Sequence, residues 1–213
     1  MKTAKKAMLM TLCAIILVVA TVFGTMAYLT ASDEVINTFT VGNVAIKLDE
    51  VPVDANGKAT AGDRVQANSY KLLPGLTYDK DPMVTVLANS EESYVKMTVT
   101  VNNANELDDI FDPSGANLLA IFGGYDADNW TYKGNTKDAA NNTRTYEFWY
   151  KETVSAGAAD VALDALFDTI TVPGEITKEQ LSTLSDLKIT VNAYAIQADG
   201  FADAAAAWAA FDA

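Results

Sequence analysis

Several short segments of the chain alternate between apolar and polar residues, the pattern of half-buried β-strands. In the clearest segment, 94–101 (YVKMTVTV), Val95, Met97, Val99 and Val101 share one face. Turn residues separate this segment from similar ones at 37–41, 44–48, 83–87, 143–151, 167–172 and 187–196. Short alternating strands between turns predict an all-β chain folded as an antiparallel sandwich or barrel.

Two short helices are predicted toward the end of the sequence. Thr177 and Gln180 form a capping-box pattern, which opens a short helix. Phe201 and Trp208 lie seven residues apart in an alanine-rich stretch. We expect these two side chains to share one face of a second helix that packs on the sandwich.

The range 43–213 shows no repeat and no low-complexity linker, so we interpret it as a single β-sandwich domain. Within it, 103–142 is irregular and rich in turn residues, which predicts a loop-rich insert. Apolar residues in strand rows are more often buried than used to bind a ligand. The predicted core residues are Phe39, Val44, Ile46, Val95, Met97, Val99, Ile189 and Val191.

The first 27 residues have the pattern of a signal peptide. Three lysines precede an apolar stretch at 7–23, and Thr25 and Ala27 are the small residues that a signal peptidase requires. We predict cleavage after Ala27, so that the mature chain begins at Tyr28. The alternative is an uncleaved membrane anchor, because the apolar stretch is near the shortest length that spans a bilayer.

The 213 residues carry 15 Lys+Arg and 28 Asp+Glu, a net charge of −13. Cleavage after Ala27 removes three lysines and no acidic residue, so the charge of the mature chain is −16. This balance repels phosphate, and we expect no nucleic-acid partner. The one cysteine, Cys13, lies in the apolar stretch. The mature chain therefore has no thiol and depends on core packing.

The chain contains no histidine, which excludes many catalytic sites. Histidine-dependent nucleophiles, histidine-ligated zinc and imidazole acid–base catalysis all require it. A two-carboxylate glycosidase and an oxygen-ligand calcium site do not. The acidic pairs 91–92 and 108–109 and the acidic turns 54–57 and 126–129 are, however, ordinary solvated charges in most proteins. We therefore expect no enzyme, no cofactor and no metal.

Several segments, in order, resemble the TasA/camelysin family of Gram-positive bacteria, secreted proteins with a SipW-dependent type of signal peptide. Together they span nearly the whole chain. They are 24–29 (GTMAYL), 37–44 (NTFTVGNV), 73–75 (LPG), 88–90 (ANS) and 188–197 (KITVNAYAIQ). Met26 departs mildly from the aromatic residue that the family shows at the signal junction.

The resemblance implies a jelly-roll-like antiparallel β-sandwich with a few short helices, exported and processed by a SipW-type signal peptidase at Thr25, Ala27 and Tyr28. It also implies a structural protein of the extracellular matrix or cell surface that forms fibres with itself or with paralogous matrix proteins. In such fibres the mature N-terminal segment, 28–42, completes a sheet of the next subunit. The donor residues are Tyr28, Leu29, Val35, Ile36 and Phe39.

Other interpretations stay open on the sequence alone. The segment 28–42 could instead pair within its own domain as a first strand. The aromatic residues Trp130, Tyr132, Trp149 and Tyr150 could form a platform for a cell-wall or matrix polysaccharide. Camelysin-like proteins carry a peptidase label, but the absence of histidine gives a peptidase no chemistry here.

Overall fold

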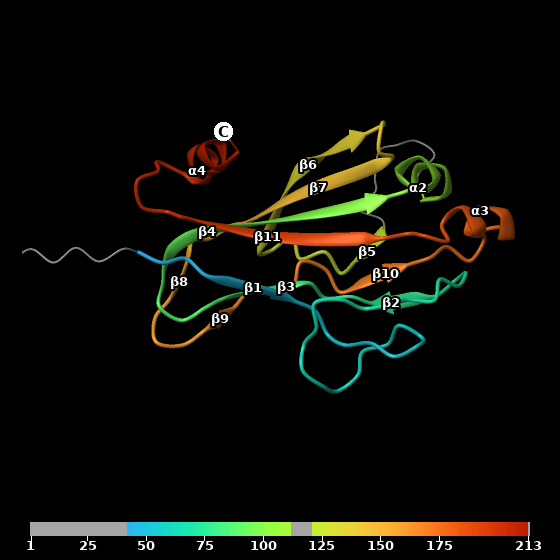
Figure 1. Cartoon of the computed structure of the whole chain (residues 1–213), viewed down its shortest axis with the longest axis horizontal. Coiled ribbons are helices and arrows are strands. Elements are labelled where there is room, and N and C mark those ends of the chain that lie inside the picture. Colours follow the sequence, from blue (N-terminus) through green and yellow to red (C-terminus); the bar gives the residue numbers. More distant parts are fainter. Residues whose placement is uncertain (1–41, 112–120, 213) are drawn as a thin grey trace, which may run out of the picture. The chain divides into compact units, whose positions relative to one another are not determined.

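Antiparallel β-sheets make up most of the structure, which confirms the predicted all-β sandwich (Figure 1). This structure, a computed structural model, describes residues 42–111 and 121–212. The predicted signal peptide, its cleavage site, the strand at 37–41 and the core residue Phe39 lie outside the described residues.

One layer of the sandwich is a five-stranded sheet in the order β11-β4-β7-β6, with β8 pairing beside β4. The predicted row at 94–101 lies in the long central strand β4, where β-branched residues favour the extended backbone. The strands are β4 (Ser90–Asn102), β6 (Trp130–Asp138), β7 (Thr143–Tyr150), β8 (Val154–Ala156) and β11 (Ile189–Gln197).

Two three-stranded sheets form the other layer, in the orders β1-β3-β9 and β2-β10-β5. All of their ladders are antiparallel. The first contains β1 (Ile46–Asp49), β3 (Met83–Val86) and β9 (Val161–Ala162). The second contains β2 (Thr77–Asp79), β5 (Phe122–Gly123) and β10 (Thr169–Thr171).

The core lies between the layers, and both contribute to it. Val95, Met97 and Val99 of β4 are completely buried, as predicted, and they pack in one cluster with residues of the opposite layer such as Val84. The other predicted core residues among those described are only half-buried. They are Val44, Ile46, Ile189 and Val191.

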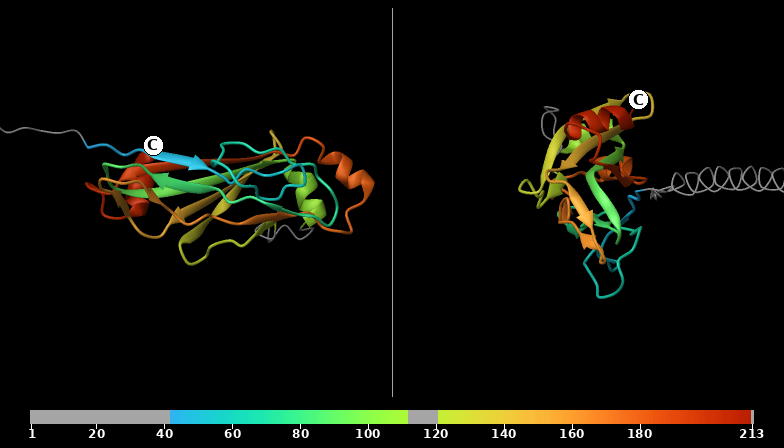
Figure 2. Two further views of the ribbon diagram at one scale, coloured as in Figure 1. Left: turned by 90° about the horizontal axis from the view of Figure 1, so that it is seen from below. Right: turned by 90° about the vertical axis from the view of Figure 1, so that its left-hand side faces the viewer.

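Three short helices occur in the described ranges: α2 (Ala104–Phe111), α3 (Lys178–Thr183) and α4 (Ala204–Phe211). Figures 1 and 2 show α3 and α4 at opposite ends of the sandwich. The capping box of α3 is confirmed, since the Thr177 side chain accepts the Gln180 N–H and the Gln180 side chain accepts the Thr177 N–H. Helix α4 begins after its N-cap, Asp203, so Phe201 lies outside it.

Trp208 of α4 is buried, in agreement with the predicted packing of this helix. Its ring covers the ammonium of Lys96, which lies 4.7 Å from the ring centroid. Lys96 also donates to the Asp212 carboxylate at 2.9 Å. An ion pair and a cation–π contact therefore hold α4 on the outer face of the five-stranded sheet.

The range 103–142 differs from the predicted loop-rich insert. Its described part contains α2, β5 and the nine-residue strand β6, which forms one edge of the main sheet. Most of β6 is exposed, and its register shifts between Tyr132 and Gly134. An exposed edge strand with a bulge does not show the regular alternation of apolar and polar residues by which strands are predicted from a sequence. For this reason β6 was not expected.

Candidate functional site

Two of the edge strands, β1 and β11, belong to different layers and border the same cavity. Among the described residues, β11 pairs with β4 on one side only, and β1 pairs with β3 on one side only. No backbone hydrogen bond joins β1 to β11 among the described residues. An open strand edge presents unpaired N–H and C=O groups that can pair with another strand.

The hydrogen bonds at the strand ends show which residues face these open edges. The Asn102 N–H donates to the Lys188 carbonyl, so even-numbered residues of β11 face β4. The backbone groups of Ile189 and Val191 therefore face away from it. On β1, the Leu87 N–H donates to the Ala45 carbonyl.

By the same alternation, the backbone groups of Ile46 and Leu48 face away from β3. Within residues 42–111 and 121–212, each edge thus carries at least two residues whose backbone groups have no strand partner. Because β1 and β11 lie on either side of one opening, these groups line it from both walls.

A cavity of about 930 Å³ lies between β1 and β11. The segment 65–72 and helix α3 complete its walls. Much of its lining is apolar, with side chains that pack against the core but are only partly covered. Examples are Ile46, Leu48, Leu72, Ile189 and Val191.

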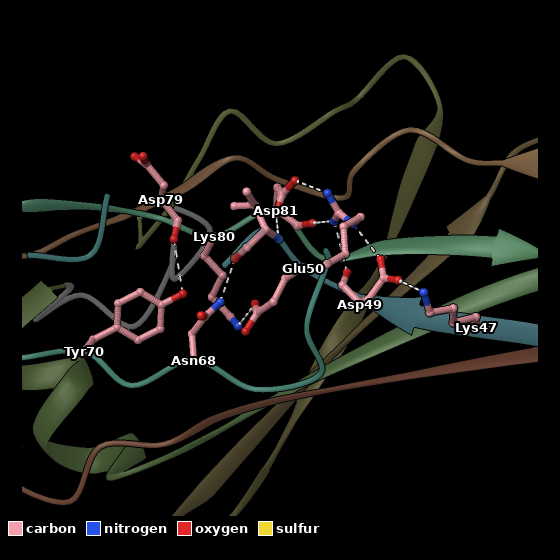
Figure 3. A network of polar contacts seen from close by, with 10 residues as sticks. Lys47, Asp49, Glu50, Asn68, Tyr70, Asp79, Lys80 and Asp81 are labelled. Carbon is pink, nitrogen blue, oxygen red and sulfur yellow. Dashed lines mark hydrogen bonds and ion pairs between the residues drawn. The ribbon is translucent and has the colours of Figure 1, made fainter. Parts of the chain in front are cut away.

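A buried ion pair lines the cavity beside these apolar side chains. Lys80 donates to the Glu50 carboxylate, and the two residues are 6% and 7% exposed. Asn68 lies beside them (Figure 3). Its Nδ2 donates to the Val51 carbonyl at 2.8 Å, and its Oδ1 accepts the Val53 N–H at 3.2 Å. The segment that carries Asn68 is thereby fastened to the chain that follows β1.

Arg64, next to the same segment, connects Asp49 of β1, which lines the cavity, with Asp81, which follows β2. Its Nε donates to Asp49 Oδ1 at 2.6 Å, and its Nη1 donates to Asp81 Oδ2 at 2.7 Å. Lys47 Nζ lies 2.7 Å from the other Asp49 oxygen. Burial alone would raise the pKa of Asp49, but hydrogen bonds from Lys47 and Arg64 outweigh it and leave this pKa below its usual value.

Two tyrosines support the base of the cavity. Tyr70 and Tyr78 meet edge to face, with ring centroids 5.7 Å apart. The Tyr78 hydroxyl donates to the Lys71 carbonyl at 2.7 Å and accepts the Leu73 N–H at 2.6 Å. Burial, with a contribution from the Glu50 carboxylate, raises the pKa of Tyr70, so this hydroxyl stays protonated at neutral pH.

The carboxylates that line the cavity have cationic partners. Both carboxylates of its lining, Asp49 and Glu50, are held in ion pairs. No group of three or more His, Cys, Asp or Glu residues that could hold a metal ion occurs among residues 42–111 and 121–212. What the cavity offers a ligand is apolar side chains and free backbone groups, which suit an extended peptide.

The acidic turns considered for calcium use their carboxylates locally. Asp54 accepts the N–H groups of Asn56 and Lys58, and Asp126 accepts those of Asp128 and Asn129. The side-chain amide of Asn129, which donates to Asp126 Oδ2 at 2.8 Å, is the largest cause of the lowered pKa of Asp126, and the N–H groups of Lys58 and Asn56 are the main cause at Asp54. Such hydrogen bonds are typical of ordinary turns.

Trp130 and Tyr132, two of the four aromatic residues proposed for a polysaccharide platform, do not form an exposed flat pair. Trp130 is 1% exposed, and its Nε1 donates to the Asp164 carbonyl at 3.1 Å. Tyr132 is half-buried and packs against Phe148. These two rings therefore contribute to the core cluster.

All of the site residues predicted from the sequence lie outside the described residues: Thr25, Ala27, Tyr28, Leu29, Val35, Ile36 and Phe39. The sequence did not indicate the polar wall, because Glu50, Arg64 and Lys80 are far apart in the chain and form no motif. Ile46, Ile189 and Val191 were found only as core residues. Their role at an open edge depends on which strands pair, and the pattern of one strand does not contain that information.

Comparison of the chain with protein-family models, with curated proteins and with solved structures gives no match. In the described part of the chain, no helix is long and apolar enough to cross a membrane. The geometry of the cavity and the sequence of the N-terminal segment are the remaining evidence on function.

Proposed function

We propose that this protein is a secreted structural subunit that assembles head to tail into extracellular fibres. In this proposal the segment 28–42 of one copy enters the cavity between β1 and β11 of the next copy as an additional strand. The observation that supports the proposal most is the pair of open edges beside a partly covered apolar cavity.

An added strand satisfies the backbone groups that face the cavity. The free N–H and C=O groups of Ile189 and Val191, or those of Ile46 and Leu48, provide the hydrogen bonds of a new ladder. Isolated strand edges of this kind are usually covered in stable proteins. A strand from a second copy covers the edge without any change in the rest of the fold.

The segment 28–42 also has the side chains that the cavity requires. Leu29, Val35 and Phe39 share one face of an extended strand with Asp33, because successive side chains alternate, and the other two donor residues, Tyr28 and Ile36, lie on the opposite face. Completing the burial of a half-buried Val, Leu or Ile contributes about 1 kcal/mol, since full burial contributes about 1.5–3 kcal/mol. Several such contacts add to the ladder hydrogen bonds.

The contact between copies joins two different surfaces, the segment of one and the cavity of the other. A head-to-tail contact of this type builds a filament where its rotation does not close a ring. Release of the segment after Ala27 by a SipW-type signal peptidase couples export to assembly, because the donor strand stays tethered until then. The partner is another copy of this chain or a paralogous matrix protein, outside the cell.

Electron microscopy of the mature protein tests the proposal. The chain that begins at Tyr28 is expected to form filaments, and a chain with extra residues before Tyr28 is expected to stay monomeric. Val191→Asp places a carboxylate at the open edge and is expected to abolish filaments, whereas Asn192→Asp, at an exposed neighbouring position, leaves them intact. Circular dichroism serves as the control that both variants fold. Monomers of the mature wild-type chain at high concentration would contradict the proposal.

A further inference from the structure

Lysines stand at the mouth of the cavity although the chain is strongly acidic. Lys47 in β1 and Lys188 next to β11 both line the cavity and are exposed. The net charge of the chain is −13. A site rimmed by lysines on such a chain favours a ligand that carries negative charge at a matching position.

Among the described residues, Lys188 is the cation of this rim without a carboxylate partner. Lys47 pairs with Asp49, and Lys80, deeper in the cavity, pairs with Glu50. No ion pair involves Lys188 in the part of the chain that the structure describes. Its backbone is fixed, since its N–H donates to Asn102 Oδ1 at 2.6 Å. The main chain from which the ammonium extends is thus fixed at one position along the open edge.

The direction of Lys188 follows from the alternation of β11. Ile189 and Val191 pack against the core, so Lys188 lies on the opposite, outer face of this strand. On β1, Ile46 and Leu48 pack inward and Lys47 is exposed between them. A strand added along these edges therefore meets the lysines with its outward row of side chains.

The segment 28–42 has one acidic residue in that outward row. With Leu29, Val35 and Phe39 directed inward, the even-numbered residues are directed outward, and Glu34 is the ionised one among them. We propose that Glu34 of the entering strand pairs with Lys188 of the receiving copy and thereby sets the register of the added strand. This inference rests on the proposed function, because it names the contact that orders the same strand in the same cavity.

An ion pair adds information that the apolar row does not contain. A slip of one residue turns the apolar row outward and is excluded by burial alone. A slip of two residues keeps the same face of the strand inward and moves Glu34 by about 7 Å. This slip breaks the pair with Lys188, and the loss adds to the cost of placing Asp33 or Asn37 at the position of Val35.

Charge reversal in the mature chain tests the pair through the critical concentration for assembly. Glu34→Lys and Lys188→Glu are each expected to raise it by about fivefold at low salt, as for an exposed cross-strand pair. The double variant is expected to recover most of the loss. Lys71→Glu is the matched control, because Lys71 is exposed beside the cavity wall but does not line the cavity.

The outcomes separate this inference from the proposed function. Filaments of wild type with equal effects of Lys188→Glu and Lys71→Glu, or a double variant no better than the single ones, overturn the Glu34–Lys188 pair and leave the fibre proposal intact. Absence of filaments from the wild-type mature chain overturns both. A fivefold loss that the double variant repairs, and that high salt removes, supports the pair.

Discussion

Two neighbouring strands of the same sheet carry matching apolar rows and bury them to different extents. Val95, Met97, Val99 and Val101 of β4 are at most 1% exposed. The residues paired with them in β11 are only half-buried. These partners are Ala195, Ala193, Val191 and Ile189, respectively.

The difference between the rows arises from their neighbours and not from their residue types. β4 is covered by β11 on one side and by β7 on the other, whereas in the described part of the chain β11 pairs with β4 alone. Val99 and Val191 are identical side chains that pair directly with each other, yet one is closed off from solvent and the other borders a cavity. The apolar row of β11 would thus be as fully buried as that of β4 if one more strand paired with its open edge.

The largest expected effect concerns the Lys80–Glu50 ion pair, which is buried, although slightly less than the β4 row, and lines the open cavity. Glu50→Ala leaves the Lys80 ammonium buried without its carboxylate partner, which costs about 3–5 kcal/mol. Urea denaturation of the mature chain measures the loss. Glu50→Leu combined with Lys80→Met removes both charges and is expected to restore most of the stability. A loss below about 1 kcal/mol for Glu50→Ala would show that water reaches this pair freely.

Two valine-to-alanine substitutions, one in each row, measure how the difference in burial affects stability. Val99→Ala is expected to cost about 2 kcal/mol in the monomer, and Val191→Ala about 1 kcal/mol, because half-buried methyl groups lose less on removal. Chemical denaturation below the critical concentration gives both values. Equal losses would mean that the β11 edge is already covered in the monomer. In filaments the Val191→Ala penalty is expected to approach that of Val99→Ala.

The smallest expected effect is a pH dependence of the cavity wall. The pKa of Asp49 is lower in the folded chain than in the unfolded chain, so its stabilising effect is present above about pH 4 and is lost as the pH falls through the folded pKa. Arg64→Met removes one of the causes of this shift and is expected to flatten the loss of stability on acidification. Lys71→Met is the control, and the same flattening in that variant would contradict the assignment to Arg64.

Local patterns in the sequence predicted the strands and much less of the site. The alternation at 94–101 was sufficient for β4, and the Thr177–Gln180 spacing was sufficient for the cap of α3. Polar, exposed β6 with its bulge was predicted as loop, since it lacks a buried row to reveal it. The cavity could not be predicted, because it depends on the absence of pairing between β1 and β11. It also depends on contacts such as Lys80–Glu50, whose two residues are thirty positions apart in the sequence.

Amide hydrogen exchange at the two open edges tests the central claim most directly. In monomers of the mature chain the N–H groups of Ile189 and Val191 are expected to exchange rapidly, while that of Val99 in β4 stays protected. In filaments, strong protection of N–H groups is expected to extend to at least one edge of the cavity. The protected pair is Ile189 and Val191 of β11, Ile46 and Leu48 of β1, or both. Strong protection of both edges in the monomer, or continued rapid exchange of both edges in filaments, would contradict the central claim.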